Sequence, residues 1–329
     1  MNAAPADAAG PLLSVAGLRV EFATRRSPRV AVHDVGFDIA RGEVLGVVGE
    51  SGAGKSLTGA AIIGLVDPPG RIAAGSVTLA GRRIDTLPAS EMRRVRGREI
   101  GAIFQDPLTA LNPLYSIGRQ LTETIRTHLP VSRDEARSRA LALLGEVGIA
   151  GAARRFDHYP HQFSGGMRQR VVLALALAAE PKLIIADEPT TALDVSLQAQ
   201  IIELLKRLCR ERHMAVLLIT HDMGVIAETA QRVAVMYAGR IVETGPVTRI
   251  LHAPGHPYTA GLMRSIPTLH DKRDRLAQID GTMPRPEALP SGCAFHPRCE
   301  RRVGACDCDL PALARSNGGS VACWNPLPA

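Results

Sequence analysis

The chain has 329 residues, which is enough for one large domain and an appendage. Its apolar fraction of 46% and charged fraction of 22% exclude a disordered protein. The net charge of +7 fits a solvated surface, with nucleic acid or an anionic membrane surface as alternative partners. We find neither a secretory signal nor an apolar run of about 20 residues, so we expect a cytoplasmic protein that reaches a membrane only through partners.

Strands and helices are predicted to alternate along the first 250 residues, after a loose Pro/Ala-rich tail at 1–11. Apolar runs rich in Val and Ile predict buried strands at Leu12–Val20, Val44–Val48, Leu183–Ala186 and Ala215–Ile219. Helical patterns occur at Lys55–Leu65, Arg133–Val147, Gly165–Ala179 and Val195–Arg212. This alternation predicts an α/β fold with a mostly parallel sheet covered by helices.

A glycine-rich loop directly follows the second of these strands. Its residues, which fit the P-loop pattern G-x-x-x-x-G-K-[ST], are Gly49, Glu50, Ser51, Gly52, Ala53, Gly54, Lys55 and Ser56, with Leu57 next in the helix. Backbone N–H groups and the helix N-terminus would hold phosphate oxygens. Lys55 would reach the outer phosphates, and Ser56 would bind Mg²⁺. A ligand-free turn is the alternative, but it does not account for the strand–loop–helix setting.

Two adjacent carboxylates end the third predicted strand. We expect Asp187 to hold Mg²⁺ through water and Glu188 to polarise an attacking water. The alternative is a helix N-terminus that favours acidic residues, with Pro189 in its first turn. The presence of a phosphate loop in the same chain favours the catalytic interpretation.

The segment Phe163–Arg170, which precedes an apolar helix, resembles the signature motif of ABC ATPases, usually written L-S-G-G-Q. Ser164 would cap the helix, and Gly165 and Gly166 would expose backbone N–H groups as a second anion cradle. The resemblance implies that this cradle covers an ATP held by the P-loop of an opposing subunit, so that the site needs a dimer. A plain helix cap is the alternative interpretation.

Other motifs of the same family follow in the family's order. The resemblance implies that Gln105 senses Mg²⁺ and the membrane subunits and that Asp194 belongs to the D-loop Ala192-Leu193-Asp194. It further implies that His221 contacts the γ-phosphate and that Phe22 stacks on adenine. We therefore expect an ABC-type nucleotide-binding domain over residues 12–250, with a helical subdomain at about 106–165.

The remaining residues, 251–329, are predicted to form a separate C-terminal extension. His256-Pro257-Tyr258-Thr259 and the run Ile279–Cys299 resemble the extension of peptide and nickel importer ATPases. The resemblance implies an ATPase that powers import of di- or oligopeptides, with nickel or another small solute as the alternative cargo. It also implies a paralogous second ATPase, two permeases, an extracytoplasmic binding protein and a place on the cytoplasmic face of the bacterial inner membrane.

Two other functions are weighed against transport. An ABC ATPase of DNA repair or translation would usually carry two cassettes or a long coiled coil, and this chain has one P-loop and no heptad run. A non-enzymatic partner with a dead site would have lost Glu188 or His221, and both residues are present.

Five of the six cysteines lie near the C-terminus. Cys293, Cys299, Cys306 and Cys323 lack the paired C-x2–4-C spacing of structural zinc sites, which favours an iron–sulfur cluster, for example of the [4Fe–4S] type. Peptide importer ATPases with this extension resemble that pattern. Zinc and free thiols remain alternatives, as does Cys308 in place of Cys306. Cys209, on a predicted helix, is interpreted as core.

Overall fold

The computed structural model describes residues 10–25, 27–106, 110–190, 194–265 and 278–328. The chain divides into two compact units. The first unit comprises Met1–Ala40, Val44–Asp85 and Ile219–Ala329, and the second comprises Arg41–Glu43 and Thr86–Leu218. Most of the predicted N-terminal tail, residues 1–9, lies outside the described residues.

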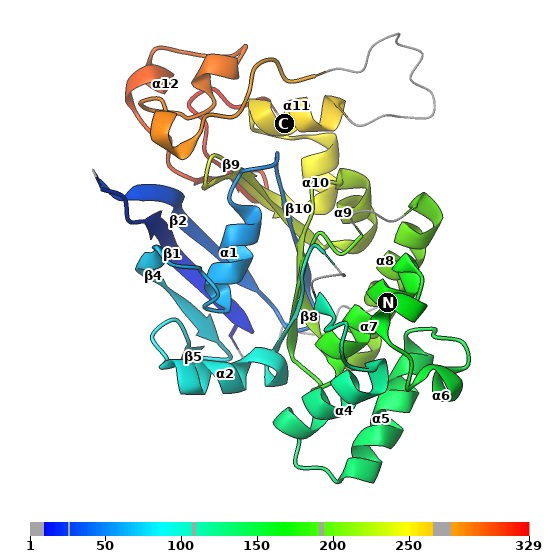
Figure 1. The fold of residues 1–329 in the computed structure, drawn as a ribbon. Coiled ribbons are helices and arrows are strands. Elements are labelled where there is room, and N and C mark those ends of the chain that lie inside the picture. Colours follow the sequence, from blue (N-terminus) through cyan, green and yellow to red (C-terminus); the bar gives the residue numbers. More distant parts are fainter. Residues whose placement is uncertain (1–9, 26, 107–109, 191–193, 266–277, 329) are drawn as a thin grey trace. The chain divides into compact units, whose positions relative to one another are not determined.

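An antiparallel sheet of four strands opens the first unit (Figure 1). Its order is β2-β1-β4-β5, and its strands are β1 (Leu13–Phe22), β2 (Arg29–Ile39), β4 (Gly70–Leu79) and β5 (Arg82–Arg83). Leu13 of β1 lies opposite Ile39 on one side and Leu79 on the other, and all three side chains are buried. One face of this sheet therefore contributes to the core of the unit.

Five more strands of the first unit pair in the order β11-β12-β10-β9-β3. They are β3 (Val44–Val48), β9 (Arg232–Tyr237), β10 (Arg240–Pro246), β11 (Ala314–Ser316) and β12 (Gly319–Val321). β3 and β9 run parallel, and every residue of β3 is buried. Continuous burial explains why β3 reads as an unbroken apolar run rather than an alternating one.

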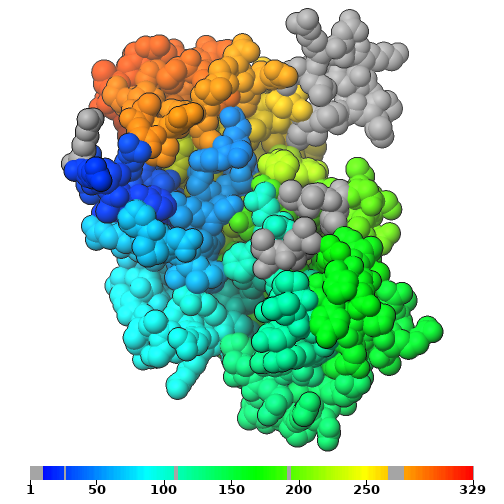
Figure 2. Space-filling view, in the orientation of Figure 1, coloured from blue at the N-terminus to red at the C-terminus, as the bar shows by residue number. Residues whose placement is uncertain are grey.

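The helices of the first unit are short. They are α1 (Lys55–Ile62), α9 (Met223–Thr229), α10 (Val247–His252), α11 (Pro257–Arg264) and α12 (Ala305–Cys308), with 3₁₀ turns at Pro286–Ala288 and His296–Arg298. Residues 278–328, called the C-terminal segment below, lie directly against the N-terminal part of the same unit (Figure 2). The Arg29–Glu287 ion pair, at 2.5 Å, is one of the contacts between them.

The second unit is mainly helical. Its helices are α2 (Ala89–Arg98), α4 (Ile117–His128), α5 (Arg133–Glu146), α6 (Ala152–Arg155), α7 (Gly165–Leu177) and α8 (Val195–Arg212), with a 3₁₀ turn at Pro160–Gln162. β6 (Ile100–Ile103) pairs in parallel with β7 (Leu183–Asp187), and β8 (Ala215–Ile219) ends at the boundary of the unit. Among the described residues, none of the helices combines the length and the apolar character that crossing a bilayer requires.

The predicted elements are found, with some changes at their ends. β3, β8 and α8 have the predicted bounds, whereas β1 runs from Leu13 to Phe22 instead of Leu12–Val20, and α7 ends at Leu177 instead of Ala179. α1 stops at Ile62 rather than Leu65, because Gly64 adopts a φ of +62° and the N–H of Leu65 bonds back to the carbonyl of Ala60 at 2.8 Å. This left-handed ending is a common way for a helix to stop at glycine.

Candidate functional site

Three glycines shape the loop between β3 and α1. Gly49, Gly52 and Gly54 have φ values of 153°, 84° and 96°, which are costly for other residues. A Cβ on Gly49 would also lie 2.2 Å from the carbonyl oxygen of Met236 on β9. Gly54 then serves as the N-cap of α1 without a side-chain bond, so the first N–H groups of that helix are not capped by a side chain. Such N–H groups suit an anion.

Lys55 bends back over the loop from the first position of α1. Its ammonium donates to the carbonyls of Gly49 at 2.8 Å and Glu50 at 3.0 Å, and the side chain is 5% exposed. The charge is therefore held above the loop whose backbone would surround phosphates. Ser56, the predicted Mg²⁺ ligand, follows on the same turn of α1.

The residues after β8 join the phosphate loop within the first unit. The N–H of Thr220 donates to the carbonyl of Val47 at 3.1 Å, so the residue after β8 lies beside the end of β3. Asp222 caps α9 by accepting from the N–H groups of Gly224 and Val225. His221 lies between these two fixed residues with its side chain exposed. His221 directly follows Thr220 and therefore lies near the end of β3, from which the phosphate loop starts.

Glu188 and Gln105 meet in the second unit. The Gln105 amide donates to the Glu188 carboxylate, with 2.9 Å between Nε2 and Oε2. Glu188 has a φ of +47°, an unusual value for a residue other than glycine and one that turns the chain sharply after Asp187. The predicted water-activating residue and the predicted sensor residue are therefore in direct contact.

The predicted second anion cradle has the expected cap. The Ser164 hydroxyl accepts from the N–H of Met167 at the start of α7. A Cβ on Gly165 would meet nothing within 4 Å, whereas one on Gly166 would lie 2.1 Å from Leu197. Gly165 therefore leaves backbone open to a ligand, and Gly166 allows α8 to approach.

Asp194 also has a structural role, because its carboxylate caps α8 by accepting from the N–H of Leu197 at 2.9 Å. Its D-loop neighbours Ala192 and Leu193 lie outside the described residues. Sequence reasoning missed Gln169, which is 3% exposed and whose amide donates to the carbonyl of Pro189, next to Glu188. The sequence gives no signal for this role, because Gln169 lies between Arg168 and Arg170 in a polar run and only the structure shows that it is buried.

The remaining predicted contacts are distributed over the two units. Phe22, the predicted adenine-stacking residue, ends β1, is half-buried and lies opposite Gly70 of β4. Ser56 belongs to the first unit, and Gln105 and Asp187 belong to the second. A hydroxyl, an amide and a carboxylate are hard oxygen donors, so the chemistry of this set fits Mg²⁺.

The C-terminal cysteines lie near one another. The N–H of Cys293 donates to the carbonyl of Cys306 at 2.9 Å. Burial, and to a lesser extent negative charge on Cys293, Cys299 and Cys306, raises the pKa of Cys323 to about 11. Among the described residues, however, no three Cys, His, Asp or Glu side chains are arranged to hold a metal ion, so the thiols as placed do not fit a cluster. Cys209 is buried, as predicted for a core residue.

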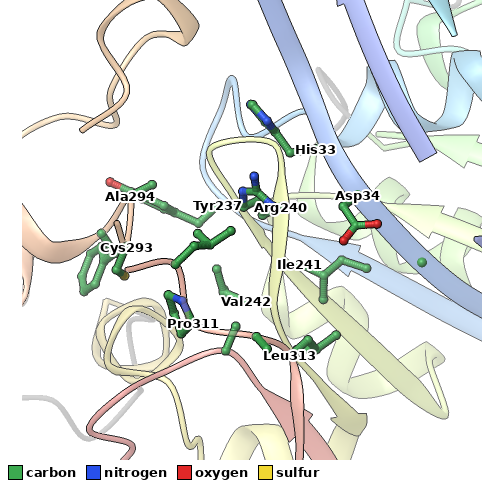
Figure 3. A pocket seen from close by; sticks show the side chains of 15 residues that line it. His33, Asp34, Tyr237, Arg240, Ile241, Val242, Cys293, Ala294, Pro311 and Leu313 are labelled. Atoms are coloured by element: carbon green, nitrogen blue, oxygen red, sulfur yellow. The ribbon is translucent and has the colours of Figure 1, made fainter. Parts of the chain in front are cut away.

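A cavity of about 310 Å³ lies beside this segment in the first unit (Figure 3). His33, Asp34 and Arg240 line one part of it, and Cys293 and Pro311 line another. Burial, with the nearby Arg240 and Arg19, lowers the pKa of His33 to about 4. None of the phosphate-loop residues lines this cavity, so it is separate from the predicted nucleotide contacts.

Comparison with known proteins gives two family matches and relatives of nearly the same length. The family described as "ABC transporter" matches residues 32–191, and the family "Oligopeptide/dipeptide transporter, C-terminal region" matches residues 242–306. A Brucella abortus protein named "Putative peptide import ATP-binding protein" is 49% identical over 97% of this chain and 96% of its own length. The dipeptide transport ATP-binding protein DppD of Escherichia coli is 46% identical, with coverages of 96% and 97%.

Solved structures show the same fold. The structure of a dimeric ATP-binding cassette bound to ADP and Pi is 29% identical in sequence, with a TM-score of 0.64. The match covers 71% of this chain and 98% of the cassette's chain. The protein cbiO1 of Clostridium perfringens, part of an ABC transporter complex, is 26% identical, with coverages of 74% and 91% and a TM-score of 0.63. With its phosphate loop, its capped signature segment and relatives matching nearly end to end, this chain belongs to the ATP-binding proteins of ABC transporters, in the group that carries the oligopeptide/dipeptide transporter C-terminal region.

Proposed function

We propose that this chain is an ATPase that powers the import of di- or oligopeptides through an ABC transporter. The observation that carries the proposal is the combination of a complete phosphate loop at 49–56 with the oligopeptide/dipeptide transporter C-terminal region at 242–306. The relatives named for peptide and dipeptide transport span this chain nearly in full and favour peptide over nickel as cargo.

The proposed roles of the site residues are those that the sequence motifs predict. Backbone N–H groups of the loop and of α1, with Lys55, bind the phosphates of ATP, while Phe22 stacks on adenine. Glu188, oriented by Gln105, positions and polarises the attacking water, and His221 contacts the γ-phosphate. Ser56, Gln105 and Asp187 would hold Mg²⁺, which would neutralise phosphate charge. Ser164, Gly165, Gly166 and Asp194 serve the composite site of a dimer.

The proposal extends to the chain's organisation and surroundings. Residues 12–250 form the nucleotide-binding domain, with a helical subdomain at about 106–165, and residues 251–329 form the extension. The partners are a paralogous ATPase, two permeases and an extracytoplasmic binding protein. The chain would lie peripherally on the cytoplasmic face of the inner membrane, where closure of the ATPase pair drives the permeases.

Uptake into reconstituted vesicles tests this function. Vesicles that contain the four membrane-bound subunits, supplied with binding protein and internal ATP, should accumulate a labelled dipeptide and not nickel. Lys55→Ala in this chain should abolish uptake, because it removes the cation above the phosphate loop. Nickel accumulation without dipeptide accumulation would replace the peptide assignment by its alternative.

A separate part of the proposal is the iron–sulfur cluster predicted at Cys293, Cys299, Cys306 and Cys323. Its support is the spacing of the four cysteines in the sequence and the backbone hydrogen bond that joins Cys293 to Cys306. Anaerobically purified protein should contain about four irons per chain and absorb near about 400 nm if the cluster is of the four-iron type. Colourless protein with one zinc, or without metal, would reject it and leave the ATPase assignment intact.

A further inference from the structure

The second residue of the phosphate loop is an acid. Glu50 follows Gly49 directly, and its side chain is 28% exposed. A carboxylate at this position would repel the phosphates that the loop binds, because two negative charges at short range repel each other electrostatically. The loop therefore needs a cation or a fixed orientation for Glu50 if it is to hold a triphosphate tightly.

Arg298, in the C-terminal segment, provides that cation. Its Nη1 lies 3.1 Å from both carboxylate oxygens of Glu50, and its side chain is only 7% exposed. The rest of the guanidinium is also bonded, since Nε donates to the carbonyl of Asp280 at 2.8 Å and Nη2 donates to that of Ile279 at 3.1 Å. Such a network fixes both the charge and the position of the arginine.

The backbone of Glu50 is held by a second residue from beyond β10. The N–H of Glu50 donates to the Tyr258 hydroxyl at 2.8 Å, and Tyr258 is completely buried on α11. The start of α11 is in turn fixed by His256, whose Nδ1 accepts from the N–H of Tyr258 at 3.0 Å. The buried carboxylate of Glu243 accepts from the N–H groups of Gly255 and His256.

Aromatic packing connects the two contacts. The Phe295 ring, three residues before Arg298, lies 5.4 Å from the Tyr258 ring and 5.3 Å from the Tyr237 ring between centroids. The Tyr237 hydroxyl accepts from Arg298 at 3.3 Å. Arg298 and Tyr258 therefore belong to one packed cluster that reaches the phosphate loop from residues outside the family match at 32–191.

We propose that Arg298 and Tyr258 are positioning residues of the nucleotide site: Arg298 neutralises Glu50, and Tyr258 fixes the first peptide of the phosphate loop. The C-terminal region thus contributes residues that position the phosphate loop of the ATP site. This inference rests on the proposed binding of ATP by residues 49–56.

Nucleotide binding by the full-length chain tests the proposal. The dissociation constant of the Mg²⁺ complex of AMP-PNP, a non-hydrolysable ATP analogue, is measured by titration calorimetry. Arg298→Ala should raise it about tenfold, because the loop that binds the phosphates then carries an unpaired carboxylate. The double variant Glu50→Gln/Arg298→Ala should return to within about threefold of wild type, because the offending charge is gone. Tyr258→Phe, which removes only the hydroxyl, should weaken binding about threefold.

Arg302→Ala is the matched control, because Arg302 is an exposed arginine of the same segment and pairs with Asp307 at 2.5 Å instead of with the loop. It should leave the dissociation constant unchanged. An unchanged constant in Arg298→Ala, or a double variant as weak as Arg298→Ala, would overturn the proposal. Wild-type chain that does not bind AMP-PNP would instead refute the ATP site itself. Should Arg298→Ala fail to fold, Tyr258→Phe still tests the proposal, and an unchanged dissociation constant in that variant would overturn it.

Discussion

At the scale of a single residue, Glu188 offers the most specific test of the chemistry. We expect Glu188→Gln to bind Mg-ATP as wild type does while turnover in the assembled transporter falls by at least about 100-fold, the usual contribution of a positioned general base. Glutamine keeps the side-chain shape and the acceptor oxygen facing the Gln105 amide but cannot take a proton. Steady-state ATP hydrolysis and nucleotide binding are the two measurements.

The matched control for that substitution is Glu180→Gln. Glu180 also adopts a left-handed φ, of +56°, in the same unit, but it pairs on the surface with Arg139. Its replacement should leave turnover unchanged. If Glu188→Gln hydrolysed ATP at a rate within a few-fold of wild type, another residue would have to be the general base. If nucleotide binding were lost together with hydrolysis, the effect of the substitution would be structural.

At the scale of an element, the start of α11 should respond to pH. Burial lowers the pKa of His256 from the ordinary 6.5 to about 4, and its Nδ1 must stay unprotonated to accept from the N–H of Tyr258. Because the folded pKa is depressed, the stabilisation is complete above about pH 6.5 and is lost as pH falls towards 4. This histidine should therefore remove about 2 kcal/mol from the free energy of unfolding between pH 7 and pH 5.

Urea unfolding at a series of pH values measures that loss. His33, whose pKa is also lowered to about 4, contributes in the same direction, so the wild-type slope alone does not isolate His256. His256→Asn retains a side-chain acceptor for the cap but does not titrate. The variant should show a shallower decline between pH 7 and pH 5, and equal slopes for the two proteins would contradict the assignment.

The bounds of the helices and strands also show how much of the secondary structure can be predicted from the sequence. β3 and α8 were predictable to the residue, because an unbroken apolar run and a long amphipathic pattern leave little choice of structure. The end of α1 was missed because Gly64 stops the helix by backbone conformation, which competes with an apolar pattern that continues to Leu65.

Among site residues, the phosphate loop and the Ser164 cap are local patterns that can be recognised in one stretch of chain. The contacts of Glu50 with Arg298 and Tyr258 are different, because they join residues 248 and 208 positions apart. Nothing in the local sequence of His256–Thr259 or of the run up to Cys299 predicts that they meet the phosphate loop. Only the folded arrangement of the first unit reveals that relation.

At the scale of the whole molecule, we expect the isolated chain to be a poor ATPase. Its signature segment at 164–166 would complete a site whose phosphate loop belongs to another subunit, and a solved relative is a dimer bound to ADP and Pi. Specific activity should therefore rise with chain concentration and rise further when the paralogous ATPase and the permeases are added. Hydrolysis rates across a dilution series, with and without these partners, are the measurement.

The substitution Gly165→Asp tests whether the signature segment acts on the nucleotide of an opposing subunit without disturbing the fold of its own chain. The position has open space around it, so the side chain should fit, and its negative charge would repel the phosphates of an opposing nucleotide. The variant should melt at the wild-type temperature and bind nucleotide at its own phosphate loop with wild-type affinity, yet lose most of the gain that the partners confer. The contrary outcome is a dilute monomer that hydrolyses ATP at the full rate, with a rate proportional to its concentration and unchanged by Gly165→Asp. That result would show that one chain holds a complete site.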